Sequence, residues 1–257
     1  MKVRPQYPDQ YPDHQAQPLP NTHRASGRTG LASRRMFRLG ILSTAALGTL
    51  GAVAGAAQAV TIDEGYSSDH GGMAFANNET LALSNIETPT TFQDSFTVHQ
   101  YGAVDSANVR NEATAESVYC SADAPCRAVS LSFQIVTMAG TDIHLNANNY
   151  SNADNVHCAG CETVAGAYQF VVDTPAAFTL SDSALAQLST IHRELNALSD
   201  SKLSISDVQS QADALALQVA SILKNAAATS PEGPVERPLG EPSFTPMVKV
   251  YRDYQQN

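Results

Sequence analysis

Four cysteines are the residues of this chain with the clearest capacity for chemistry. They form two pairs, Cys120-x5-Cys126 and Cys158-x2-Cys161. Such thiols can form disulfides, hold a tetrahedral zinc ion, or act as a redox dithiol at the second pair. In an exported protein disulfides are the default, and the sequence leaves all three connectivities of four cysteines open. His157, beside the second pair, is an alternative metal ligand.

The segments that follow the two pairs form an internal repeat. Residues 126–137 align without gaps on residues 161–172, and apolar residues alternate with small or polar ones in both copies. A period of two predicts strands. One face should belong to the core, and the opposite face, which carries Ser132 and Gln134, should be thinly covered. The apolar face comprises Val129, Leu131, Phe133, Ile135, Val164, Tyr168, Phe170 and Val172.

These patterns predict an α+β fold. Two copies are too few for a solenoid, so we expect a pseudo-symmetric pair of units, residues 118–137 and 156–173, within one small antiparallel sheet. The Asn-rich segment between them, residues 144–155, should form a short strand and then a loop. Together with the helices described next, the units would form one domain over residues 60–225.

An antiparallel helical hairpin is expected over residues 181–225, because the period changes from two to between three and four. Asp182 suits the first helix start, and Ser206 with Gln209 matches a capping box for the second. The apolar stripes should pack on each other and on the sheet, with a partner-binding coiled coil as the alternative. They comprise Leu185, Leu188, Ile191, Leu195 and Leu198, and Val208, Ala212, Leu215, Val219 and Ile222.

Residues 226–257 hold five prolines and should form a flexible tail, in which Met247 to Tyr251 could add an edge strand. Residues 1–59 at the other end have the composition of a disordered segment followed by an export signal. The paired Arg34 and Arg35 resemble a twin-arginine signal, from which Arg38 departs because that position prefers an apolar residue.

A weakly apolar, charge-free run from Leu39 to Ala57 follows the arginines. The small residues Ala57 and Ala59 suit a signal peptidase, and cleavage after Ala59 is expected. An ordinary Sec signal and an uncleaved anchor are the alternatives. All three place the rest of the chain outside the membrane, secreted or in the cell envelope, and the signal segment would contact the membrane only transiently.

The charge of the chain argues against a nucleic-acid partner. The whole sequence has a formal net charge of −10, and residues 1–59 hold 7 basic and 2 acidic residues, which leaves 8 basic and 23 acidic residues and a net charge of −15. Phosphate binding requires clustered positive charge. An envelope or extracellular protein is the expected partner.

The doubled unit, with Val-x-x-x-[Phe/Tyr]-Gln-x-Val after each final cysteine, resembles an uncharacterised exported domain of actinobacteria that also occurs in proteins described as peptide zinc metalloproteases. The likeness covers about residues 108–225. The spacing between Cys120 and Cys126 departs from the two-residue spacing of that family. The resemblance implies an envelope setting but no peptidase activity, because this chain lacks the His-Glu-x-x-His motif.

No other catalytic motif is present in the sequence: it has no phosphate-binding loop with Gly-Lys and no Gly-x-Ser-x-Gly. We therefore expect a disulfide-stabilised, non-catalytic binding or structural protein without a cofactor. A four-cysteine zinc-binding protein is the alternative, and a thiol-disulfide oxidoreductase is the third possibility.

Overall fold

The computed structural model of the chain describes residues 61–64, 72–229 and 247–257. The predicted signal residues Arg34, Arg35, Ala57 and Ala59 lie outside this part. Within it, no helix is both long and apolar enough to span a bilayer.

Seven strands and two long helices make up the described part. In chain order they are β1 (Thr61–Glu64), β2 (Gly72–Ser84), β3 (Thr90–Val118), β4 (Arg127–Ala139), β5 (His144–Val156), β6 (Glu162–Thr174), α1 (Asp182–Ala197), a short 3-10 turn (Leu198–Asp200), α2 (Ile205–Ala228) and β7 (Met247–Gln256). The fold is therefore α+β, as predicted.

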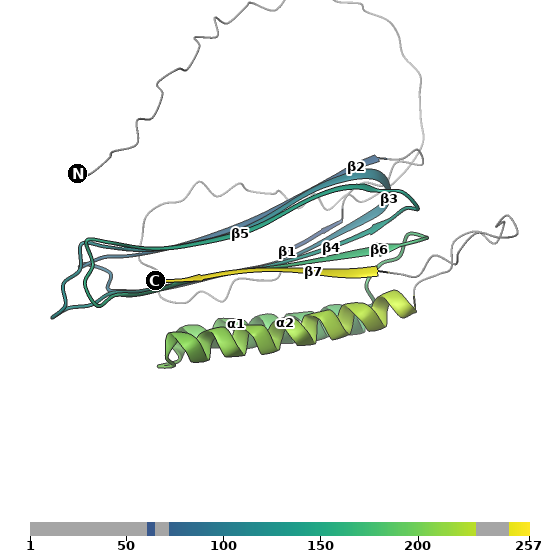
Figure 1. The fold of residues 1–257 in the computed structure, drawn as a ribbon. Coiled ribbons are helices and arrows are strands. Elements are labelled where there is room, and N and C mark those ends of the chain that lie inside the picture. The colour runs from purple at the N-terminus through teal and green to yellow at the C-terminus, as the bar shows by residue number, and fades with distance from the viewer. Residues whose placement is uncertain (1–60, 65–71, 230–246) are drawn as a thin grey trace, which may run out of the picture. The chain divides into compact units, whose positions relative to one another are not determined.

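The strands form three coils that stack in two layers (Figure 1). In each coil, a strand of one layer, sheet B, leads through a turn to a strand of the other layer, sheet A. Sheet B contains β2, the C-terminal half of β3 and β5. Sheet A contains β1, the N-terminal half of β3, β4, β6 and β7. The long β3 ends the first coil in sheet A and begins the second coil in sheet B.

The prediction of an antiparallel sheet is wrong, because all strand pairs except β6 with β7 are parallel. The two copies pair side by side in the same register in which their sequences align without gaps. Phe133 pairs with Tyr168, and Gln134 pairs with Gln169. A parallel pair needs a return path between its strands. Strand β5 supplies that path, and an earlier coil, built from β2 and β3, extends the repeat to three.

The Asn-rich segment is the strand β5 over its whole length, so the predicted loop is wrong. Asparagine has a low strand propensity, but hydrogen bonds between the side-chain amides of successive coils overcome this local preference. The side chain of Asn78 donates to Asn111 at 3.0 Å, and that of Asn111 donates to Asn149 at 2.9 Å. One asparagine ladder thus crosses all three coils of sheet B.

The small and polar face of β4 and β6 is not thinly covered, because sheet B packs on it. Ser132, Gln134 and Gln169 are all fully buried there. Asn78 donates to Ser132 Oγ at 2.9 Å, and Gln134 donates to the Arg110 carbonyl at 2.9 Å, so the layers are joined by hydrogen bonds. Short side chains on both sheets allow this close, polar contact.

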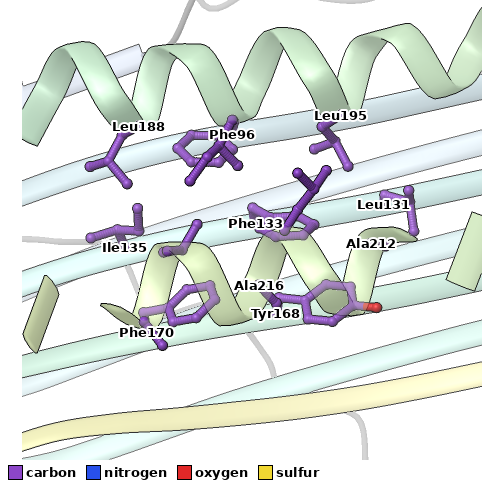
Figure 2. Packing of buried hydrophobic residues seen from close by; sticks show 14 of the residues in the cluster. Phe96, Leu131, Phe133, Ile135, Tyr168, Phe170, Leu188, Leu195, Ala212 and Ala216 are labelled. Atoms are coloured by element: carbon purple, nitrogen blue, oxygen red, sulfur yellow. The ribbon is translucent and has the colours of Figure 1, made fainter. Parts of the chain in front are cut away.

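The apolar face of sheet A packs against α1 and α2, as the alternation predicted. Figure 2 shows the rings of Phe96, Phe133 and Tyr168 among side chains of the two helices. The Phe133 ring stacks on Tyr168, with ring centres 4.5 Å apart, and on Phe96 at 5.8 Å. The helical stripes therefore serve the core of the domain, with Leu188 and Leu195 fully buried.

Asp182 lies in the first turn of α1, as expected, whereas the start of α2 differs from the expected capping box. Ser181, for which no role was predicted, caps α1 by accepting from the Ala184 amide. Ser204, rather than Ser206, caps α2 by accepting from the Asp207 amide at 3.2 Å. The helix begins two residues earlier because Ile205 is buried and extends the apolar stripe.

Candidate functional site: the cysteine cluster

The four cysteines gather where two successive coils turn from sheet B to sheet A. Cys120 and Cys158 follow the sheet B strands of their coils, while Cys126 and Cys161 immediately precede β4 and β6. The register of the sheet A strands places the last two side by side, and the Cys126 amide donates to Cys161 Sγ at 3.1 Å. All four sulfurs lie within 4.8 Å of one another.

Each pair is closed within its own turn by a disulfide. The Cα atoms are 5.9 Å apart in Cys120–Cys126 and 5.7 Å apart in Cys158–Cys161. Both distances are usual for disulfides. Of the three connectivities left open by the sequence, the structure has the one with the two shortest loops.

The longer spacing of the first pair is absorbed by a small turn. Ser121 and Ala124 form an isolated antiparallel bridge, and the Ala124 amide donates to the Ser121 carbonyl at 3.0 Å. The extra residues project from the coil, so Cys126 keeps its place beside Cys161. The departure in spacing therefore leaves the sulfurs of both pairs in one cluster.

His157 lies beside the cluster and stacks on Tyr119. The two rings are 5.6 Å apart and nearly parallel. Both residues precede the first cysteine of their pair and have positive φ, 55° at Tyr119 and 50° at His157. Non-glycine residues seldom adopt this conformation. Its recurrence in equivalent turns shows that the same backbone geometry brings each first cysteine back toward its partner.

The donor set of the cluster fits zinc when the cysteines are reduced. In a tetrahedral Zn(Cys)4 site with Zn–S bonds of about 2.3 Å, sulfurs are separated by about 3.8 Å. The observed separations, all within 4.8 Å, require only small shifts after the disulfides open. Cys120, Cys126, Cys158 and Cys161 would be the ligands.

The second pair has little in common with thioredoxin-type redox pairs. In those, the dithiol opens a helix whose N-terminus favours the thiolate. Here the residue after Cys161 begins the strand β6. Arg127 and Glu162, which follow the second cysteine of each pair, are 4.0 Å apart and partly offset each other's charge near the cluster.

A buried Asp94–His192 pair joins sheet A to α1 within the apolar core. Asp94 Oδ2 and His192 Nε2 are 3.1 Å apart, with side-chain exposures of 7% and 3%. The imidazole also stacks on Phe96. Sequence reasoning missed this pair, although an aspartate at an apolar position of the strand pattern was a usable signal.

Tyr168, predicted as core, also has a polar role at its outer end. Its hydroxyl donates to Asp213 of α2 at 2.9 Å, and Arg252 of β7 donates to the same carboxylate at 2.8 Å. Burial, followed by the Asp213 charge, raises the pKa of Tyr168 far above its ordinary value. Tyr168 is therefore a neutral donor that ties three elements together.

Comparison with known proteins adds no identification: no protein family, curated protein or solved structure matches this chain.

Proposed function

We propose that the chain is an exported, non-catalytic binding or structural protein whose described domain is stiffened by its two disulfides. The observation that carries this proposal is the closure of equivalent turns in successive coils by Cys120–Cys126 and Cys158–Cys161. The disulfides fasten one end of a scaffold whose two sheets are already joined by buried hydrogen bonds. Such a scaffold suits the presentation of a surface outside the cell.

Disulfides persist in oxidising compartments, so they are consistent with export. Arg34 and Arg35 belong to the export signal that the sequence predicts. Replacing both by lysine should retain the protein in the cytoplasm if the twin-arginine route is used, whereas Arg38→Leu should leave export intact. Immunoblots of cytoplasmic and exported fractions measure this. Undiminished export of the double variant would contradict the twin-arginine route.

Intact mass of the exported protein tests the disulfides themselves. With two disulfides the chain is four hydrogens lighter than the reduced chain, and no cysteine is alkylated before reduction. Four thiols that react without reductant, in protein that holds no metal, would overturn the proposal. An assay with a dithiol substrate belongs in the same series, since rapid turnover would instead favour an oxidoreductase.

A zinc-binding protein is the second candidate, favoured by the gathering of all four sulfurs within 4.8 Å. A twin-arginine substrate folds in the reducing cytoplasm, where thiolates meet metal before any oxidant. Native mass spectrometry of protein from the cytoplasm and from the exported fraction separates the candidates. One zinc per chain, with four thiols that become alkylatable only after chelation, would replace the disulfide assignment.

The resemblance to actinobacterial exported domains supports the same envelope setting. The strong negative charge predicted for residues 60–257 keeps such a protein soluble and favours partners with basic surfaces. Capture of envelope proteins on immobilised residues 60–257 tests the binding role. Captured partners that are lost when the disulfides are reduced would link binding to the stiffened scaffold.

A further inference from the structure

Strand β2 is a long edge strand with apolar side chains facing outward. Met73 and Phe75 are 61% and 62% exposed, and Leu81 and Leu83 are 48% and 41% exposed. Of the strands that the structure describes, only β3 pairs with β2, along all 13 residues. A long, apolar edge strand is a template for pairing with another strand.

The opposite edge of sheet B, strand β5, is partly occupied by side chains of β7. Strand β7 adds to β6 in the neighbouring layer, and its side chains reach the backbone of β5. The Ser151 amide donates to Asp253 at 2.7 Å, and the Ala153 amide donates to Gln255 at 3.1 Å. Because two β5 edge donors are already taken by β7 side chains, the β5 edge of a second molecule is a poorer partner for β2 than a second β2 edge. Open-ended growth through sheet B is therefore disfavoured.

The sequence of β2 is self-complementary about its centre, Asn78. Strand residues alternate between faces, and the exposed face reads Met73, Phe75, Asn77, Glu79, Leu81, Leu83. In an antiparallel pairing of two copies centred on Asn78, Met73 lies opposite Leu83 and Phe75 lies opposite Leu81. Asn77 then lies opposite Glu79, so the two glutamates are diagonal rather than directly opposite.

We propose that the β2 edge is a docking surface for a second copy of this chain, which forms a two-fold symmetric dimer by antiparallel β2–β2 pairing. The self-complementary order of side chains favours a second copy of the chain as the binding partner, since a two-fold symmetric contact requires one surface to match itself. Strand β1 pairs with Thr97–Gln100 at the corresponding edge of sheet A, so the contact is confined to sheet B. The inference deepens the proposed binding role and rests on it.

Sedimentation of residues 60–257 at several concentrations should show a reversible dimer. Leu81→Lys places two lysines opposite phenylalanines at the interface, and we expect dimerisation to weaken about 100-fold, or about tenfold per lysine. Tyr150→Lys is the matched control, because Tyr150 is 47% exposed on the same sheet but lies on β5. A chain that stays monomeric, or a dimer equally weakened by both variants, would overturn the proposal.

Cross-linking tests the geometry independently of the lysine variants. About the two-fold axis, Glu79→Cys residues of the two copies are diagonal neighbours, about 7–8 Å apart. Met73→Cys residues are separated by ten strand positions, or about 33 Å. A short bismaleimide should therefore link the first variant and not the second. The wild-type chain, treated in the same way, reports any link through its native cysteines and so tests their oxidation separately. Links in both variants beyond that background, or only in the second variant, would exclude the antiparallel pairing.

Discussion

The two faces of sheet A are equally buried but differ in chemistry. Toward the helices, Leu131, Phe133 and Ile135 pack with other apolar side chains. Toward sheet B, Ser132 and Gln134 of the same strand donate hydrogen bonds to the Asn111 side chain and the Arg110 carbonyl. A strand can therefore be fully buried on both faces while its sequence alternates, provided that the polar face meets a second polar sheet. The comparison predicts that the two interfaces fail in different ways when they are altered.

The largest effect is expected on the apolar face. Phe133→Ala removes a fully buried ring that stacks on Phe96, Tyr168 and Phe170. The free energy of unfolding should fall by about 4 kcal/mol, because transfer and cavity costs add. Denaturant melts measure it, with Phe133→Leu as the milder control. A loss below about 1 kcal/mol would show that the helices do not pack on this face.

The polar face should be almost as sensitive. Asn111→Ala removes bonds to the side chains of Asn78, Ser132 and Asn149 and leaves buried polar groups without partners. We expect a loss of about 3 kcal/mol. Asn108 is the matched control, since it lies on the exposed face of the same strand and its alanine variant should change stability by less than about 0.5 kcal/mol. Equal effects would mean that the ladder is not buried.

The disulfides, which close the turns at one end of the polar interface, should contribute less to the free energy of unfolding. Replacing Cys158 and Cys161 together by serine opens a four-residue loop, which costs about 2 kcal/mol in the chain-entropy model. The seven-residue loop of Cys120–Cys126 should cost slightly more. Melts of the two double variants, compared with the oxidised wild type, check both values. A reduced chain as stable as the oxidised chain would contradict the stiffening role.

The smallest effect is expected at Asp173, a partly buried carboxyl on the polar face of β6. Burial raises the pKa of Asp173 from 3.8 to about 6, although Lys249 and a backbone bond to Thr174 lower it. The folded chain therefore binds this proton more tightly than the unfolded chain, so stability is fully present below about pH 4 and is lost as pH rises through 6.

Between pH 4 and pH 7 this carboxyl should cost roughly 1 kcal/mol, after allowance for its partial exposure. Asp173→Asn should remove that part of the pH dependence and stabilise the chain at pH 7. Melts at both pH values, with Asp154→Asn on the exposed face of β5 as control, measure the difference. An unchanged pH profile in Asp173→Asn would contradict the raised pKa.

The sequence predicted the strands and the apolar face, but not the burial of the polar face. Alternation identified the strands, because it depends only on a period of two. The gapless repeat coincides with the register of β4 on β6, but an antiparallel sheet was predicted, so that register was not predicted. The first coil, built from β2 and the N-terminal half of β3, escaped detection. It lacks cysteines, and Asp94 takes the place of the apolar Leu131, although Phe92 and Phe96 keep the pattern of Val129 and Phe133.

The remaining differences come from contacts between distant residues. Asparagine favours loops locally, whereas pairing with β3 and the side-chain ladder through Asn78, Asn111 and Asn149 hold β5 as a strand. The cysteine pairing likewise depends on two turn conformations with positive φ at Tyr119 and His157, which the spacing of the pairs does not encode. The four site cysteines themselves were identifiable from sequence, whereas the Asp94–His192 pair required the fold.

Tryptic mapping of the unreduced protein tests the central claim, that each disulfide closes one turn, most directly. Cleavage after Arg110, Arg127 and Arg193 separates the two cysteine pairs, because no other lysine or arginine lies between Arg110 and Arg193. The account predicts two unlinked peptides, residues 111–127 and 128–193, each lighter by two hydrogens. A disulfide joining the two peptides, or free thiols in either one, would contradict it.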